Sequence, residues 1–298
     1  MTIGYVLDDT LDKSDGVQQA MIAIAEKMRS LGHDVHYIVP SCERTDLSQV
    51  HRVGRVISLK FNGNSVRTPI WSSRKKIKQL FNDYNFDVIH VQMPYSPIMA
   101  SKVIMLAPKN TLVIGTFHIL PYNFLSSFGT KLIGIFMRRS LNRFDKMFAV
   151  SRPALEFMKN SFKVDGSIMP NPINYDYFHR FSFGQKDKTK TRIVFVGRFD
   201  ERKGVKQLVS AYEMIQNKDN VELIMCGKGP LWDSIKSKVE NQKLNVQMPG
   251  FVSEEEKARY LASANIAVLP STSGEAFGIV LTEAMSAGAE ITIGGNNP

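Results

Sequence analysis

The chain has 298 residues, of which 43% are hydrophobic and 22% charged, a balance typical of a globular protein with room for two domains. Its formal net charge of +10 indicates an anionic partner, which could be a nucleotide, a nucleic acid or an acidic membrane. Only two cysteines occur, and no apolar run approaches the roughly 20 residues of a membrane span. The first residues, MTIGYVLDD, lack the basic and apolar regions of a signal peptide, so we expect a cytosolic or peripheral membrane protein without disulfides.

Short apolar runs alternate with helical patterns along the first half of the chain. The strand candidates are, in order, IGYVL, DVHYIVP, DVIHVQ, TLVIGTF and KMFAVS. Between the first two, apolar residues recur at helical spacing over 17–31 and Gly32 follows. Strands that are almost continuously apolar and separated by helices predict a parallel sheet with both faces covered.

The second half repeats this alternation with the strand candidates RIVFVG, VELIMCG, NIAVLP and EITIGG. Two prolines in MPNPINYDYF interrupt the pattern, so we expect Rossmann-like domains over 1–172 and 173–298. Ligands of such sheets bind at the carboxyl ends of the strands, and paired domains are expected to place a site in the cleft between them. The sequence stops directly after its last strand, from which we expect a truncated second domain.

Residues 273–288, SGEAFGIVLTEAMSAG, carry two glutamates around a glycine-led apolar helix. Glu275 is expected in the loop before the helix, and Gly278 at its start, where unpaired N–H groups and the positive dipole end suit a phosphate. Glu283 lies roughly 7 Å further along the axis, at about 1.5 Å per residue, so one ligand could reach both carboxylates. Spacing alone favours the alternative, an amphipathic helix with two solvated glutamates.

Two cations, Arg198 and Lys203, follow the strand RIVFVG. Such residues can neutralise a diphosphate leaving group, the work of a metal ion in other enzymes, and a solvated basic loop is the alternative. The next strand ends at Gly227 in a turn with room for a ligand, but the dinucleotide fingerprint G-x-G-x-x-G lacks its third glycine there. The sequence has no metal-ligand spacing.

In the first half, Gly16 ends a polar turn before a helix, where it admits a phosphate or simply makes the turn. Ser14 or Asp15 is expected to cap this helix. His118 follows the strand TLVIGTF and is expected to face the cleft, although a lone histidine is more often a structural hydrogen-bonding residue. His90 is equally ambiguous.

The segment RTPIWSSRKKIKQLFNDY, residues 67–84, predicts a basic amphipathic helix. One face is apolar from Ile77 to Tyr84, and the lysines lie off it. A cationic helix beside exposed apolar residues can hold an acidic membrane surface, while a solvated basic face on a packed helix is at least as common.

These features occur in the order of a known family: Gly16, His118, Arg198, Lys203 and the Glu275-x7-Glu283 pair. The segments VGRFDERKG, PGFVSEEEKARYLASANIAVLP and GEAFGIVLTEAMSAG follow the same order. Over essentially all 298 residues the chain resembles the retaining glycosyltransferases of family 4, which have the GT-B fold of two facing Rossmann-like domains.

Within the family the chain looks most like the phosphatidylinositol mannosyltransferases, on the strength of DGVQ, FNGNSVR, SRKKIK, GTFH and GEAFGIVLTEAM. The resemblance implies GDP-mannose as donor, a phosphatidylinositol headgroup as acceptor and no required cofactor or metal. It also implies peripheral binding to the inner face of the plasma membrane. It gives no oligomeric state.

The resemblance further implies a role for each candidate residue. The catalytic residues would be His118, Arg198, Lys203 and Glu275. The donor-binding residues would be Gly16, Gly227, Val252, Glu254, Lys257, Gly278, Ile279, Val280 and Glu283, with Glu283 on the ribose diol and 252–257 near the base. The acceptor-binding residues would be Gln18, Asn62, Asn64 and Ser65. The membrane-binding residues would be Arg74, Lys75, Lys76 and Lys78.

Two departures from the family pattern stand out. Asp15 replaces the first of two usual glycines, and its carboxylate would repel a diphosphate unless it turns away. Family chains also continue past Pro298. Three alternatives remain: a family 4 enzyme with a UDP-sugar and a soluble acceptor, a dinucleotide-dependent oxidoreductase, and a nucleic-acid binder. The missing glycine fingerprint disfavours the second, and scattered basic residues without interleaved aromatics disfavour the third.

Overall fold

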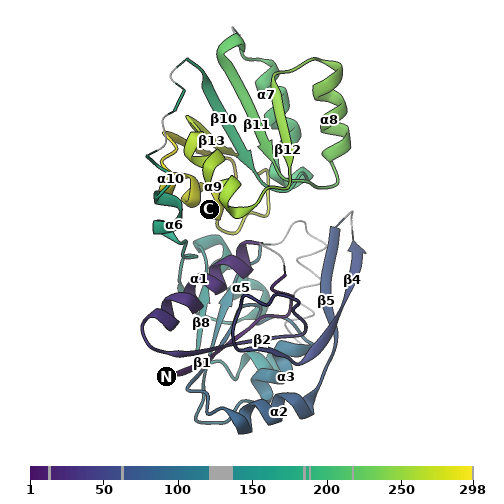
Figure 1. Ribbon diagram of the computed structural model, residues 1–298. Coiled ribbons are helices and arrows are strands. Elements are labelled where there is room, and N and C mark those ends of the chain that lie inside the picture. The colour runs from purple at the N-terminus through teal and green to yellow at the C-terminus, as the bar shows by residue number, and fades with distance from the viewer. Residues whose placement is uncertain are drawn as a thin grey trace. The chain divides into compact units, whose positions relative to one another are not determined.

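The computed structural model describes residues 1–12, 15–61, 64–120, 137–183, 186–187, 189–216 and 218–296. The chain forms two compact units, Met1–Pro172 and Ile173–Pro298 (Figure 1). Each unit has a parallel sheet with helices packed on it and its own hydrophobic cores. The expected class of α/β fold with two Rossmann-like sheets is therefore confirmed.

The sheet of the N-terminal unit is parallel and has the strand order β3-β2-β1-β6-β7-β8-β9. Its strands are β1 (Thr2–Val6), β2 (Asp34–Val39), β3 (Val50–Arg52), β6 (Val88–Val91), β7 (Leu112–Phe117), β8 (Lys146–Ala149) and β9 (Ser167–Ile168). The chain runs outward from β1 in one direction to β3 and then returns to β6 on the other side. Ligands of such sheets bind at the strand ends beside this reversal, so the segments that follow β1, β6 and β7 hold candidate site residues.

The helices of this unit begin where polar residues interrupt the apolar pattern. They include α1 (Gly16–Ser30), α2 (Arg74–Asp83), α3 (Met99–Leu106) and α5 (Arg152–Phe162). Asp15 holds the N-cap position of α1 but its side chain makes no capping hydrogen bond, contrary to the expected cap, and Ser14 lies outside the described residues. Ser73 caps α2, because its hydroxyl oxygen accepts from the Lys76 N–H at 3.2 Å. An antiparallel hairpin of β4 (Gly54–Phe61) and β5 (Asn64–Ser72), which the sequence patterns did not predict, precedes α2.

The sheet of the C-terminal unit is also parallel, with the order β12-β11-β10-β13-β14. Its strands are β10 (Thr191–Val196), β11 (Val221–Cys226), β12 (Val246–Gly250), β13 (Ile266–Leu269) and β14 (Ile291–Gly294). Its helices are α6 (Tyr175–His179), α7 (Val205–Glu213), α8 (Trp232–Asn241), α9 (Glu254–Ser263) and α10 (Ile279–Ser286), with short 3-10 turns η1 (Glu201–Lys203) and η2 (Lys218–Asn220).

Neighbouring residues of the central strands β10 and β11 face different cores. Phe195 and Met225 pack in one cluster with α7 and α8, whereas Val194 and Ile224 pack in another with α6, α9 and α10. Because both faces of the sheet are buried, the strands read as continuous apolar runs rather than alternating ones. Among the described residues, no helix is long and apolar enough to span a membrane.

Candidate active site

The first part of the site joins two loops of the C-terminal unit, one after β10 and one after β13. The Lys203 ammonium lies 2.5 Å from the Glu275 carboxylate, and the other carboxylate oxygen accepts from the Gly278 N–H at 3.0 Å. Burial, the largest influence on Glu275, raises its pKa, but attraction and hydrogen bonds from Lys203 and Gly278 outweigh it and hold the pKa below the ordinary value. Glu275 is therefore an ionised acceptor beside a fixed ammonium.

The helix start predicted at Gly278 is confirmed. Gly278 is the N-cap of α10 with φ of 81°, in the left-handed region that favours glycine, and Ile279 and Val280 begin the helix. This first turn follows Glu275 closely in the chain, and the start of a helix leaves N–H groups without intrahelical partners. This arrangement provides positive charge and backbone donors suited to an anion.

The second glutamate is buried, and the solvated-helix alternative is wrong for it. Glu283 is 2% exposed and accepts from the Lys257 ammonium at 2.9 Å. Lys257 is itself buried and also lies 2.9 Å from the Glu254 carboxylate. Burial raises the pKa of Glu283 to about 6 despite the attraction of Lys257. Among the described residues, the second carboxylate oxygen of Glu283 has no hydrogen-bond partner, so it can accept from a ligand hydroxyl.

Arg198 does not join the Lys203–Glu275 pair. Its side chain is partly exposed and its Nε lies 3.9 Å from Asp200, a residue that the sequence analysis missed. The Asp200 carboxylate caps η1 by accepting from the Lys203 N–H at 3.1 Å and also accepts from Arg202 at 3.2 Å. The acidic residues within the basic loop RFDERKG were the available signal, since a carboxylate among cations forms charge-assisted hydrogen bonds with them.

The remaining donor-side candidates lie on neighbouring loops. Gly227 has φ of 127°, and a Cβ there would lie 1.9 Å from the Gly197 carbonyl oxygen, so the loops after β10 and β11 approach too closely for any side chain. Its N–H donates to the Gly250 carbonyl at 2.7 Å. Val252 is half-buried two residues further on and precedes α9.

In the N-terminal unit the structure describes some predicted residues and not others. Gly16 begins α1, and the buried Gln18 donates to the Thr10 carbonyl at 3.3 Å. Asn62 lies outside the described residues. The backbones of Asn64 and Ser65 belong to β5, and their side chains also lie outside the described part.

His118 is buried, with 8% of its surface exposed, at the end of β7. Its Nε2 lies 2.9 Å from the side-chain oxygen of Gln92, which directly follows β6. Burial lowers the pKa of His118 to about 4, so the imidazole is neutral at physiological pH. Gln92 was not predicted, although a polar residue directly after the apolar run DVIHV was visible in the sequence.

Asp8 follows β1 and is another missed polar residue of this sheet edge. Its carboxylate accepts hydrogen bonds from the Ser96 hydroxyl and from the Met99 N–H, the latter at 3.2 Å. Burial raises its pKa to about 7 against these bonds. The pair of aspartates in VLDD, directly after the first strand, was the signal that pointed to it.

The basic helix α2 is a packed helix with an exposed basic face, as the alternative in the sequence analysis described. Its apolar stripe of Ile77, Leu80 and Phe81 is buried in the core, so this face is not available to lipid. The exposed apolar side chains lie beside the helix instead, at Ile70 and Trp71 of β5 and at Met105 of α3.

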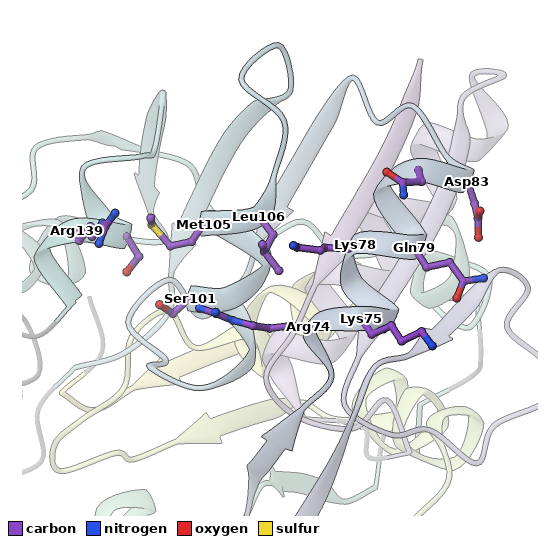
Figure 2. Close-up of a pocket in the computed structure, with 11 residues that line it drawn as sticks. Arg74, Lys75, Lys78, Gln79, Asp83, Ser101, Met105, Leu106 and Arg139 are labelled. Carbon is purple, nitrogen blue, oxygen red and sulfur yellow. The ribbon is translucent and has the colours of Figure 1, made fainter.

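The exposed face of α2 borders a hollow of about 950 Å³. Arg74 and Lys78 reach from α2 toward α3 and Arg139, whereas Lys75 and Asp83 extend away from α3 (Figure 2). Lys76 does not line the hollow, and its ammonium lies 3.4 Å from the Arg52 carbonyl oxygen. The hollow is thus a cationic surface feature of the N-terminal unit.

Family models match nearly the whole chain. The model "Glycosyltransferase Family 4" matches residues 14–177, more than half of the chain, and "Glycosyl transferases group 1" matches 179–292. The chain belongs to glycosyltransferase family 4. The enzyme class predicted from the order of its motifs is therefore confirmed at the level of a glycosyltransferase.

Two curated relatives of this family 4 chain carry the same name, "Phosphatidyl-myo-inositol mannosyltransferase". That of Mycobacterium tuberculosis (strain CDC 1551 / Oshkosh) is 29% identical over 297 residues, which cover 98% of this chain and 77% of the relative. That of Propionibacterium freudenreichii is 28% identical over 305 residues and 98% of this chain, with 76% of the relative covered.

A solved structure shares the fold of this glycosyltransferase. Anabaena HepE in complex with UDP and glucose matches with a TM-score of 0.68 and 16% identity, over 98% of this chain and 80% of HepE. The fold is GT-B, as predicted.

Proposed function

We propose that this glycosyltransferase moves a sugar, first of all mannose from GDP-mannose, to a phosphatidylinositol-type lipid. The proposal rests on the glycine-led start of α10 and on two lysine–glutamate pairs whose glutamates flank it in the chain. The pair Lys203–Glu275 is partly buried and the pair Lys257–Glu283 is buried. The names of relatives at 28–29% identity over 98% of the chain support the choice of sugar and acceptor. The C-terminal unit would bind the donor and the N-terminal unit the acceptor.

The donor diphosphate would be held by Arg198, Lys203 and the backbone N–H groups of Ile279 and Val280, with Gly278 allowing the close approach of the backbone. In the reaction the bond from the anomeric carbon to the phosphate oxygen breaks, and a bond to the acceptor hydroxyl oxygen forms on the same face of the sugar. The hydroxyl proton passes to the departing phosphate oxygen. The positive groups stabilise the charge that grows on the leaving phosphate, and their fixed positions need no reorganisation during the reaction.

The carboxylates would position the two sugars of the donor. Glu275 would accept from hydroxyls of the transferred sugar, and the free oxygen of Glu283 would accept from the ribose diol, because an ionised carboxylate only accepts. The 252–257 segment with Val252 and Glu254 would lie near the base.

Isothermal titration calorimetry with GDP-mannose and with UDP-glucose tests this donor assignment. We expect selective binding of GDP-mannose, followed by mannose transfer to vesicles that contain phosphatidylinositol. A preference for UDP-glucose would contradict both GDP-mannose as the donor and the assignment as a mannosyltransferase. Transfer to a soluble acceptor, with no transfer to lipid, would contradict a phosphatidylinositol-type lipid as the acceptor.

We also propose that the exposed cations of α2 dock the enzyme on an anionic membrane. The double substitution Arg74→Glu with Lys78→Glu is expected to weaken binding to phosphatidylinositol-containing vesicles by about 10- to 100-fold, at roughly 1 kcal/mol per basic residue near the surface. Sedimentation with vesicles measures this. The exposed lysines of the other unit provide a control with the same charge change, Lys236→Glu with Lys243→Glu. Equal losses in both double variants would contradict docking through α2.

A further inference from the structure

The hollow of about 950 Å³ in the N-terminal unit lies along the outer side of the helices α2 and α3 (Figure 2). Apolar side chains of both helices pack in a single buried core, which fixes the helices against each other. Arg74 and Lys78 of α2 line the hollow, and Ser101 and Met105 of α3 line it as well. Residues four apart lie on the same side of a helix, so each helix presents a short stripe of side chains to the hollow.

The hollow is separate from the strand-end residues of this unit. Asp8, Gln92 and His118, which follow β1, β6 and β7, are not among the residues that line it. A third element contributes Arg139, which belongs to the helical residues 137–141. The hollow is therefore a surface feature built by three segments that are far apart in the sequence.

The lining of the hollow is strongly cationic. It includes Arg74, Lys75, Lys78 and Arg139, and Asp83 is the one carboxylate among the lining residues. Arg74 and Lys78 reach toward α3 and Arg139, whereas Asp83 extends away from α3 (Figure 2). Within the described ranges, the ion pairs with carboxylates are formed by other side chains. Cations that converge without a counter-ion repel one another, and a bound phosphate relieves this repulsion while it accepts their hydrogen bonds.

A β-bulge exposes two large apolar side chains on the strand that leads into α2. In the hairpin, Val56 pairs with Pro69 and the residue before Val56 pairs with Trp71. Ile70 is therefore an extra residue in β5, and such a bulge interrupts the alternation of the strand. Ile70 and Trp71 are 53% and 51% exposed, although regular alternation would turn only one of them outward.

These apolar groups indicate what kind of phosphate compound fits the surface. Met105 lines the hollow itself and is 40% exposed, which adds a third apolar side chain beside the cations. Tryptophan favours the boundary between lipid headgroups and acyl chains. Cations next to exposed apolar side chains match an amphiphile with a phosphate at its polar end better than they match a free phosphate ion.

We propose that the hollow between α2 and α3 is a discrete site for the phosphate of one anionic lipid, with Arg139 as a ligand from outside the docking helix. Arg74, Lys78 and Arg139 bind the phosphate, and the exposed side chains of Met105 and Trp71 contact the acyl chains. The inference rests on the proposed docking of α2 for the presence of a membrane, and it adds a saturable site to a general attraction between charges.

Neutralising two neighbouring arginines tests the discrete site. Arg139→Gln is expected to weaken sedimentation with vesicles of phosphatidylcholine and phosphatidylglycerol by about 10- to 100-fold, the effect of losing a charge-assisted hydrogen bond to phosphate. The control Arg138→Gln removes the same charge from an exposed residue that does not line the hollow, and it should weaken binding by no more than about fivefold. Arg139→Lys keeps the charge without the two-pronged contact and should give an intermediate loss.

Equal losses in the two glutamine variants would overturn the discrete site. A loss in Arg74→Glu with Lys78→Glu would then still support docking through α2, so the two failures are distinguishable. Phosphatidylglycerol is the anionic lipid in these vesicles because it is not the proposed acceptor.

A water-soluble lipid tests the hollow without a membrane. By calorimetry, dihexanoyl phosphatidylglycerol below its micellar concentration is expected to bind at one saturable site, with the affinity lowered by Arg139→Gln and retained by Arg138→Gln. Glycerol 3-phosphate and inorganic phosphate should bind at least about tenfold more weakly, because they have no acyl chain to bury. Equal affinity for inorganic phosphate would overturn the lipid assignment, and an absence of saturable binding would overturn the site.

Tryptophan fluorescence measures the apolar part of the contact. The chain has two tryptophans, so Trp232→Phe leaves Trp71 as the only emitter. The emission of Trp71 is expected to shift to shorter wavelength when phosphatidylglycerol vesicles bind, since the indole ring leaves water, and to stay in place with glycerol 3-phosphate. Vesicle binding without this shift would overturn the contact between Trp71 and lipid.

Discussion

Replacing Glu275 by glutamine is expected to lower kcat for sugar transfer by about two to three orders of magnitude, the range found when one preorganised electrostatic group is removed. The carboxylate holds the Lys203 ammonium at 2.5 Å and the first N–H of the α10 start at 3.0 Å. Glutamine keeps the shape but loses the charge that fixes Lys203 and accepts from sugar hydroxyls. Transfer from GDP-mannose to phosphatidylinositol vesicles measures kcat, and calorimetry with GDP measures nucleotide affinity, which should change far less.

A matched glutamate–lysine pair between η1 and the first turn of α7 provides the control. Glu201 and Lys206 also lie 2.5 Å apart, but both side chains are about half exposed. Glu201→Gln should leave transfer near the wild-type rate, since exposed pairs contribute little. Normal transfer by Glu275→Gln would remove Glu275 from the sugar side of the site.

Replacing Lys257 by methionine is expected to lower the free energy of unfolding by about 3–5 kcal/mol at pH 8. The substitution leaves Glu283, 2% exposed, as a buried carboxylate without its ammonium partner at 2.9 Å. Urea unfolding gives the change as a shift of the midpoint.

The loss of unfolding free energy caused by Lys257→Met should be smaller at pH 5 than at pH 8. The pKa of Glu283 is about 6 in the folded protein, above its ordinary value of 4.5, so the folded state binds more protons and its stability falls as the pH rises through this window. Without Lys257 the pKa rises further, so at pH 5 the folded protein keeps Glu283 protonated and avoids the buried charge, whereas at pH 8 it must bind a proton at a cost in free energy or bury the unpaired charge. An equal loss of unfolding free energy at both pH values would contradict the explanation that the variant leaves the Glu283 carboxylate buried without a partner.

Two further variants separate this effect from simple loss of a lysine. Lys206→Met breaks the exposed pair with Glu201 and should cost no more than about 1 kcal/mol. The double change Lys257→Met with Glu283→Met should recover most of the stability, because replacing a buried ion pair by apolar residues is often neutral or stabilising.

The sequence by itself determined the class of fold and the family. Continuous apolar strands between helices predict parallel sheets because both faces must be buried, and the structure has this arrangement in both units. Gly278 followed by an apolar helix predicted the start of α10 from local conformation alone. These features depend on residues that are close together in the sequence, so they can be predicted from the sequence alone.

Only the tertiary structure decided which charges meet. Lys203 and Glu275 are 72 residues apart and Lys257 and Glu283 are 26 apart, and no spacing rule connects the members of either pair. The same holds for Gln92 and His118, which meet because β6 and β7 are neighbours in the sheet. Burial of Glu283 also follows from packing around α10, and burial sets its pKa. The strength of an ion pair and the pKa of a side chain depend on the surrounding groups and on the local dielectric constant. Both are set by how the chain folds at the sheet edge, and residue order alone does not determine them.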